Sequence, residues 1–297
     1  IALELEDKIL GHNPKLRNSK TNTVDEIIES PFYKKDKIRN HYNSIILNFK
    51  DNFSIEFRAY DEGVAYRFST NYKGEITIKN EIAEFNFDKD YKSYIPYVSP
   101  RKQDYGTDIE KQFLTSFEAP YTVDNLSNMY DERLSFLPIL VELDDNKKAV
   151  ITESDLEDYP GMFLMKSRDC NYSLEGVYAT APKTEIQGGH NMLQLLITER
   201  QEYIAKTDGK RTFPWRIITI SEEDYQLTDN DMVYKLASPS RVEDISWIKP
   251  GKVAWEWWNA WNISGVPFES GINNDTYKFY IDFASKNNIE YVILDEG

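Results

Sequence analysis

The sequence predicts a mainly β protein, in which a large antiparallel β-sandwich precedes the first βαβ unit of a (β/α)8 barrel that this chain leaves incomplete. Two observations lead to this fold class. Short alternating apolar runs with turn residues between them fill residues 1–236, where convincing long helices are scarce. Residues 251–297 instead show a strand, a helix and a second strand, and residues 237–250 connect the two parts.

The sandwich is predicted strand by strand from alternation. A hairpin turn is expected at Asp61-Glu62-Gly63, and one short helix is expected around residues 108–116. An antiparallel sandwich buries the apolar faces of so many strands most simply. The predicted strands are residues 44–49, 53–60, 63–68, 75–78, 84–87, 137–143, 149–151, 162–165, 191–198 and 216–220.

The connector and the barrel opening follow from a change of pattern. Residues 237–250 contain two prolines and no steady periodicity. Residues 253–258 and 291–294 are short apolar runs that end in polar residues, as buried parallel strands do. Between them, apolar residues recur at helical spacing from Asn274, the expected N-cap, to about residue 287. Two of eight strands cannot close a barrel.

Composition limits the classes of partner. The 297 residues are 40% apolar and 14% aromatic, which suits a large globular core, and the formal net charge is −15. Phosphate backbones and anionic membranes require a basic surface, so we expect no nucleic acid and no membrane partner. No apolar run approaches the roughly 20 residues of a membrane helix. Neutral ligands or cations fit better.

Several kinds of chemistry are disfavoured by the residues present. The single cysteine, Cys170, excludes an intrachain disulfide framework. The three histidines are too dispersed for a transition-metal motif, and no phosphate loop or Gly-x-Ser-x-Gly elbow occurs. The chain starts at Ile1 without a signal segment, so we expect the numbering to begin inside a longer precursor.

Five segments together resemble glycoside hydrolase family 97 and cover nearly the whole chain. The barrel opening is more similar to the retaining α-galactosidase branch than to the inverting α-glucosidase branch. The resemblance implies an N-terminal β-super-sandwich, a catalytic barrel, a C-terminal β domain absent here, and calcium-dependent hydrolysis of α-linked sugars in the periplasm or outside the cell. We expect a monomer or a small homo-oligomer. The segments are RNHYN (39–43), FRAYDEGVAYRF (57–68), ITESDLEDYPGM (151–162), GKRTFPWR (209–216), and WEWW (255–258) through DEG (295–297).

Hydrolysis of a glycosidic bond requires two carboxyl groups, whose separation decides between retention and inversion. The resemblance implies that both lie on later barrel strands, so no residue of this chain is predicted to be catalytic. Three functions stay open: a retaining α-galactosidase, an inverting α-glucosidase, and a non-catalytic carbohydrate-binding protein that uses some of the 20 tyrosines and six tryptophans.

One acidic residue of the sandwich is a candidate metal ligand. Glu153 follows an apolar run and precedes the turn Tyr159-Pro160-Gly161, so we place it in a loop. Calcium takes several oxygen ligands from distant segments, and the resemblance implies that the sandwich supplies one glutamate. Glu153 is therefore the predicted Ca²⁺ ligand. The alternative is an exposed loop acid among Asp155 and its acidic neighbours.

The barrel opening contains candidate substrate-binding residues. As a strand, residues 255–258 would send Trp255 and Trp257 to one face and Glu256 and Trp258 to the other. Indole faces and carboxylates suit the apolar face and the hydroxyls of a sugar, so Glu256, Trp257 and Trp258 are predicted to line the cleft, with core packing as the alternative.

Two further candidates follow from position. Asp295 comes after the second barrel strand, and functional groups of barrels gather at the C-terminal ends of strands. We therefore expect Asp295, with Glu296 beside it, to face substrate. His190 lies in the flexible loop Gln187-Gly-Gly-His190 and could donate to a sugar hydroxyl or to a carboxylate; the alternative is a surface turn.

Overall fold

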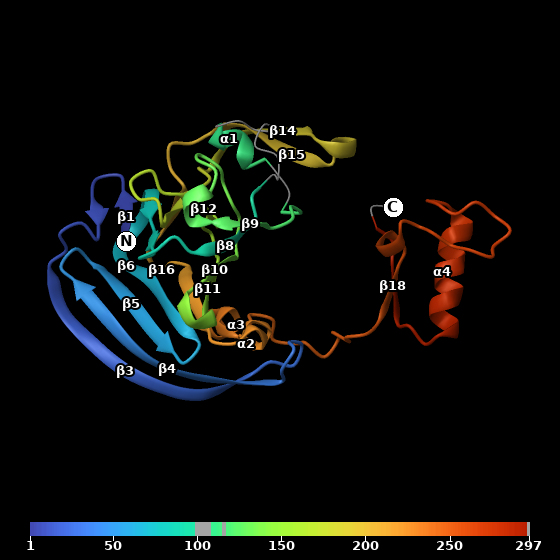
Figure 1. Ribbon diagram of the computed structural model, residues 1–297, viewed down its shortest axis with the longest axis horizontal. Helices are drawn as coiled ribbons and strands as arrows, with labels where there is room; N and C mark the ends of the chain where they lie inside the picture. Colours follow the sequence, from blue (N-terminus) through green and yellow to red (C-terminus); the bar gives the residue numbers. More distant parts are fainter. Residues whose placement is uncertain (99–107, 115–116, 296–297) are drawn as a thin grey trace. The chain divides into compact units, whose positions relative to one another are not determined.

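The computed structural model describes residues 1–98, 108–114 and 117–295, and the chain divides into two compact units, Ile1–Ser238 and Pro239–Gly297 (Figure 1). The first unit is built from β-strands and the second contains a single βαβ arrangement. The predicted fold class is therefore confirmed. Among the described residues, no helix is both long and apolar enough to cross a bilayer.

A large antiparallel sheet dominates the first unit, with twelve strands among the described residues. Nine of them follow one path in the order β3-β4-β5-β6-β17-β11-β10-β8-β9, while β1 and β16 pair with β6 and β2 pairs with β1. The strands are β1 (Ala2–Leu5), β2 (Ile9–Leu10), β3 (Leu16–Glu29), β4 (Lys37–Phe49), β5 (Phe53–Tyr60), β6 (Gly63–Ile82), β8 (Lys92–Ile95), β9 (Thr122–Asn125), β10 (Ile139–Glu142), β11 (Lys148–Ser154), β16 (Ala205–Thr212) and β17 (Trp215–Ser221).

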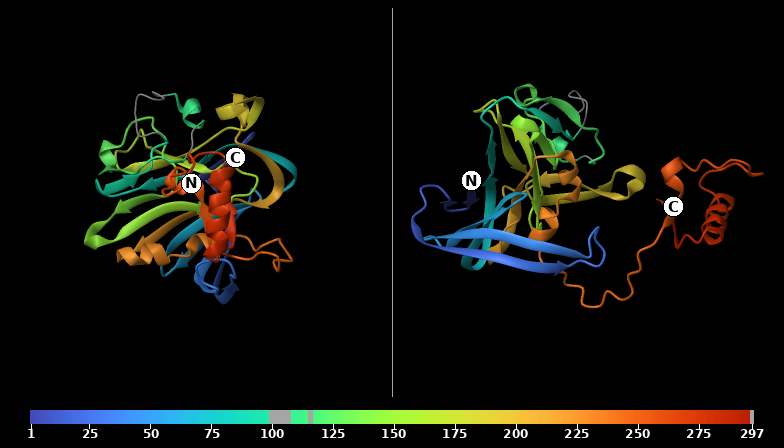
Figure 2. Two further views of the ribbon diagram at one scale, coloured as in Figure 1. Left: turned by 90° about the vertical axis from the view of Figure 1, so that its right-hand side faces the viewer. Right: turned by 60° about the horizontal axis from the view of Figure 1, so that its bottom comes forward.

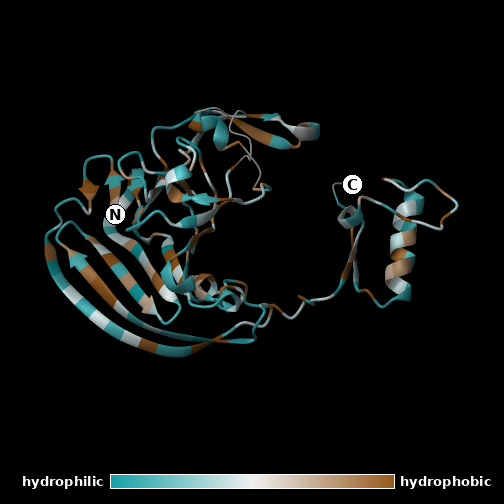
Figure 3. Ribbon diagram, in the orientation of Figure 1, coloured by the Kyte–Doolittle hydropathy of each residue, from teal (hydrophilic) through white to brown (hydrophobic). Residues whose placement is uncertain are grey.

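Smaller elements complete the first unit. A three-stranded sheet has the order β12-β13-β7, and β14 and β15 form a separate hairpin that extends from the rest of the unit (Figures 1 and 2). Figure 3 shows apolar residues in this hairpin, where Ile186, Leu193 and Leu195 are exposed. The bounds are β7 (Glu84–Asn86), β12 (Met162–Lys166), β13 (Ser173–Tyr178), β14 (Pro182–Gly188), β15 (Gln194–Arg200), α1 (Ile109–Gln112), α2 (Asp224–Asp229) and α3 (Met232–Leu236).

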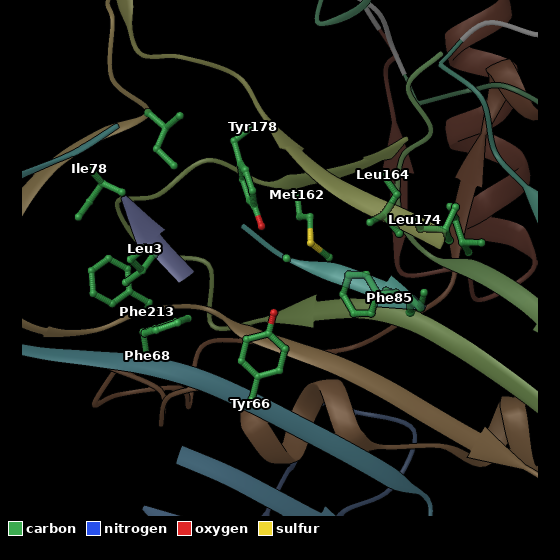
Figure 4. Packing of buried hydrophobic residues seen from close by; sticks show 14 of the residues in the cluster. Leu3, Tyr66, Phe68, Ile78, Phe85, Met162, Leu164, Leu174, Tyr178 and Phe213 are labelled. Carbon is green, nitrogen blue, oxygen red and sulfur yellow. The ribbon is translucent and has the colours of Figure 1, made fainter. Parts of the chain in front are cut away.

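Two apolar layers lie on opposite faces of the large sheet. Between this sheet and the three-stranded sheet, Tyr66 and Phe68 pack in one cluster with Leu164 and Leu174 (Figure 4). Successive strand residues point to opposite faces, so Trp215 of β17 lies in the other layer, with Met232 and Leu236 of α3. Arg216 must then point into the layer between the sheets.

Every predicted strand overlaps an observed one, but β6 differs in extent. Residues 63–68 and 75–78 were expected to be separate strands, whereas β6 is continuous from Gly63 to Ile82. Ser69, Thr70 and Asn71 still pair with β16, and residues 72–74 fall where the register shifts between Asp208 and Lys210. The expected short helix is α1, and residues 115–116 of that expectation lie outside the described residues.

The turn at Gly63 leaves no room for a side chain. A Cβ there would lie 2.4 Å from the carbonyl oxygen of Ile218 and 2.8 Å from Sδ of Met232, and φ is +151°. Gly74 has a φ of +75° but nothing within 4 Å of its Cβ position. Because overpacking adds about 1–3 kcal/mol, we expect Gly63→Ala to destabilise the protein by that much more than Gly74→Ala. Urea unfolding of both variants measures the difference, and equal losses would contradict the close contact.

The second unit is one parallel βαβ arrangement. Strands β18 (Val253–Trp255) and β19 (Tyr291–Ile293) pair in parallel, and α4 (Asn274–Lys286) connects them. The helix cap is Asn273, one residue before the expected position: its Oδ1 accepts from the amide of Thr276 at 2.9 Å.

The first barrel strand is shorter than expected. The prediction of a strand over residues 253–258 is wrong beyond Trp255, because Glu256–Asn259 form a 3₁₀ turn. Ala260 and Trp261 follow with φ of 52° and 55°, so the backbone turns away from the sheet. The predicted alternation of Glu256, Trp257 and Trp258 across two faces therefore does not occur.

Candidate functional site

Three strands of the first unit place Glu153 beside a buried arginine. In the register of β11 with β17, Glu153 lies opposite Arg216, and in the register of β17 with β6, Arg216 lies opposite Tyr66. Directly opposed residues of antiparallel strands point to the same face of the sheet. Glu153 thus lies on a strand with its side chain toward the interior of the unit, and the prediction that it lies in a loop is wrong.

Arg216 joins two carboxylates. Its Nε and Nη2 donate to the two oxygens of Glu81 at 2.7 and 2.8 Å, and its Nη1 donates to Oε2 of Glu153 at 2.5 Å. The side chains of Arg216, Glu81 and Glu153 are 1%, 3% and 15% exposed. Two carboxylates and one guanidinium carry a net charge of −1. The alternative of an exposed loop acid is therefore wrong for Glu153.

Burial affects the ionisation of Glu153 and of two tyrosines near it. It raises the pKa of Glu153, and the positive charge of Arg216 and the amide of Met162 oppose that shift in pKa. Burial also raises the pKa of Tyr66 and of Tyr178, whose hydroxyl groups point toward each other in Figure 4 and have no hydrogen-bond partner among the described residues. The cluster therefore lies in a poorly hydrated part of the sandwich.

The surroundings of Glu153 fit a hard cation at one carboxylate oxygen. The amide of Met162 lies 3.1 Å from Oε1, and a Cβ at Gly161 would lie 3.3 Å from the same atom, so the glycine avoids a tight contact with that oxygen. Carboxylate oxygens are the ligands that Ca²⁺ prefers. The described residues contain no group of three or more acidic, histidine or cysteine side chains that could hold a metal. Glu153 would be one ligand of a larger set, and its metal role stays a prediction.

In the second unit, Glu256 connects the C-terminal ends of the two parallel strands. It is fully buried, and its Oε1 accepts from the backbone amide of Asp295 at 2.8 Å and from the hydroxyl of Tyr277 at 3.4 Å. Its Oε2 has no partner among the described residues. The structure therefore brings Glu256 and Asp295 together, with the carboxylate of Glu256 turned inward rather than exposed on a cleft surface.

The tryptophans next to Glu256 differ in exposure. Trp258 is 83% exposed and Trp257 is 49% exposed. The ring of Trp257 lies 4.7 Å from that of Trp261, and the ring of Trp258 lies 6.1 Å from that of Trp255. Trp258 thus has a large free ring surface of the kind that sugars stack on, whereas Trp257 is partly covered. Their contact with sugar stays a prediction.

His190 lies at the tip of the β14–β15 hairpin, in the short 3₁₀ turn His190–Met192. Gly189 before it has a φ of +73°, and a Cβ there would lie 2.0 Å from Oε1 of Gln194, so the turn requires glycine. The histidine side chain lies outside the described residues, as does Glu296. The backbone of His190 thus lies in a surface turn, and its contact with substrate stays a prediction.

The sequence interpretation missed Arg216 and Glu81. A signal existed, since Arg216 interrupts the apolar run of β17 and an arginine in a buried strand needs a carboxylate partner. Glu81 lies near the end of β6, far away in sequence, so only the paired strands identify it.

Comparison with family models defines the class of protein. Residues 1–239 match the model described as Glycosyl-hydrolase 97 N-terminal, and residues 257–297 match the model described as Glycoside hydrolase 97. These two matches place the chain among the glycoside hydrolases. Within them, the chain is a member of glycoside hydrolase family 97, which confirms the resemblance read from the five segments.

Individual relatives agree with this membership. The chain is 49% identical over 298 aligned positions to a retaining alpha-galactosidase of Bacteroides thetaiotaomicron, covering 100% of this chain and 44% of that relative. A family 97 enzyme from Pseudoalteromonas sp. strain K8, solved with acarbose, is 21% identical with a TM-score of 0.74, covering 98% of this chain and 41% of that one. A beta-arabinopyranosidase is 19% identical with a TM-score of 0.75, covering 98% of this chain and 44% of that one. The two solved structures show the fold alone.

Proposed function

We propose that this chain forms part of a calcium-dependent retaining α-galactosidase that acts on terminal α-linked sugars. The observation that carries the proposal is the 49% identity to a retaining alpha-galactosidase along the full length of this chain. Because the chain spans less than half of that relative, the activity is proposed for the whole protein.

The described residues have binding and positioning roles in this proposal. Trp258 supplies an indole face for the sugar ring, and Asp295, held by Glu256, accepts from a sugar hydroxyl. Glu153 contributes one oxygen to Ca²⁺, which when bound supplies a fixed positive charge. Retention requires a nucleophile and an acid/base about 5–5.5 Å apart, and both are assigned to other strands of the barrel.

Hydrolysis by the full-length protein tests the proposal. p-Nitrophenyl α-galactoside, α-glucoside and β-arabinopyranoside are supplied with and without a calcium chelator, and NMR follows the anomer released. We expect α-galactose as the first product, with a rate that falls in chelator and returns with Ca²⁺. β-Glucose would instead indicate an inverting α-glucosidase, and no turnover of any substrate would favour a carbohydrate-binding protein.

The environment and assembly of the protein are part of the same proposal. We propose that it acts in the periplasm or outside the cell, where it encounters oligosaccharides. We also propose that it is a monomer or a small homo-oligomer. Cell fractionation and light scattering of the full-length protein test these two points.

Trp258 offers a test of sugar stacking that leaves the fold intact. Because its side chain is 83% exposed in the described residues, Trp258→Ala is expected to change the stability of this chain little. Loss of one sugar-stacking face, at about 1 kcal/mol, should raise KM for the α-galactoside about fivefold with little change in kcat. Trp247, which is 71% exposed, provides the matched control, and Trp247→Ala should leave KM unchanged. An unchanged KM in Trp258→Ala would exclude stacking on this ring.

A further inference from the structure

The buried pair Glu81–Arg216 is joined by two hydrogen bonds. Both oxygens of Glu81 accept from the arginine, so the guanidinium plane cannot rotate without breaking two hydrogen bonds. The remaining donor, Nη1, is aimed at Oε2 of Glu153. A planar arginine fork held in this way fixes the direction of its third hydrogen bond, which a lysine cannot do.

The consequence appears at Glu153. Its Oε2 is held by Arg216 and also lies 3.2 Å from the amide of Met162, while among the described residues Oε1 receives only the 3.1 Å contact from that same amide and lies beside Gly161, which has no side chain to cover it. Of the three charged side chains, Glu153 is the most exposed. Buried charges are stabilised when they are paired, and the cluster keeps a net charge of −1 at this edge. One further positive charge near Oε1 would balance it.

We propose that Glu81 and Arg216 are positioning residues for the calcium site, which fix the Glu153 carboxylate so that Oε1 is presented to the cation. This inference rests on the proposed role of Glu153 as a Ca²⁺ ligand. Residues that orient a metal ligand without touching the metal contribute about 10–100-fold to metal affinity. The same factor is expected here from Glu81, which acts on Glu153 through Arg216.

Calcium affinity of the full-length protein tests the inference, measured by isothermal titration after removal of bound metal, with the melting temperature in chelator recorded in parallel. The variants are Glu81→Gln, Arg216→Lys and Glu153→Gln, and Glu81→Gln is combined with Glu153→Gln. The control is Glu142→Gln on β10, a carboxylate that pairs with Lys92 and Tyr94 rather than with Arg216. If Arg216→Lys does not fold, the nearly isosteric Glu81→Gln still decides the result.

We expect Glu81→Gln and Arg216→Lys to raise the calcium Kd about 10–100-fold and Glu142→Gln to leave it unchanged. In the Glu153→Gln background, Glu81→Gln should cause no further loss, because its effect passes through Glu153. A lowered melting temperature with an unchanged Kd would show a purely structural pair and overturn the inference. Normal calcium binding in Glu153→Gln would overturn the positioning role of Glu81 and Arg216 but leave the α-galactosidase proposal standing. Absence of calcium binding in the wild-type protein would overturn both the positioning role and the proposed calcium dependence.

Discussion

Arg216→Met is expected to lower the free energy of unfolding by about 3–5 kcal/mol. The substitution keeps much of the side-chain volume but removes the one positive charge that, among the described residues, is hydrogen-bonded to Glu81 and Glu153. Two carboxylates then remain in a layer lined by Tyr66 and Tyr178, where water is scarce. Urea unfolding in chelator, so that bound metal does not contribute, measures the loss.

Two controls separate charge pairing from packing in this experiment. Arg39→Met removes a surface arginine that also holds a carboxylate, Asp25, by two hydrogen bonds, and should change stability little because both groups are exposed. Replacing Glu81 and Glu153 with leucine together with Arg216→Met removes every charge at once and should recover most of the loss, since apolar replacement of a whole buried ion cluster is often neutral. A triple variant as unstable as Arg216→Met would show that shape rather than charge matters here.

The fold was predictable where packing alternates. β5 is a clear case: Phe53 and Ile55 are buried while Ser54 and Glu56 are not, so period two is visible in the sequence and the strand was predicted with its observed bounds. β3 could not be found in this way. It lies at the edge of the large sheet, most of its 14 residues are exposed, and its polar sequence leaves pairing with β4 as its main support.

The short helices α2 and α3 were missed for a related reason. Each has only five or six residues, which is too short to display a helical period, and α3 is held by burial of Met232 and Leu236 against the sheet. The local signal for α2 was the spacing of Glu223 and Gln226, where the Gln226 side chain accepts from the amide of Glu223 at 3.0 Å.

The candidate sites show the same division between local and non-local information. The sequence pointed to Glu153 and Asp295 because each follows an apolar run, which is a local feature. It could not show that Arg216 faces Glu153, because that contact depends on the register of β11 with β17. Nor could it show the turn after Trp255, because a run of aromatic residues suits either a strand or a covered loop.

Glu256→Ala is expected to lower kcat/KM for the α-galactoside about 100-fold, because misplacement of a functional group by about 1 Å can cost that much. Its buried carboxylate is the acceptor that holds the backbone amide of Asp295, at the C-terminal ends of β18 and β19, where we propose that substrate binds. Without it, that amide loses its partner and the end of β19 can move. Glu256→Gln keeps an acceptor oxygen of the same reach and should retain most of the activity.

Glu290 provides the matched control for this prediction. Its carboxylate also accepts a backbone amide across the two strands, that of Lys252 at 2.8 Å, but it does so at their N-terminal ends. Residues at the N-terminal ends of barrel strands contribute to stability rather than to catalysis. Glu290→Ala should therefore leave kcat/KM nearly unchanged, even if the melting temperature falls. Equal losses of activity in Glu256→Ala and Glu290→Ala would mean that both carboxylates only stabilise the strand pair, and Asp295 would then lose its proposed role in binding substrate.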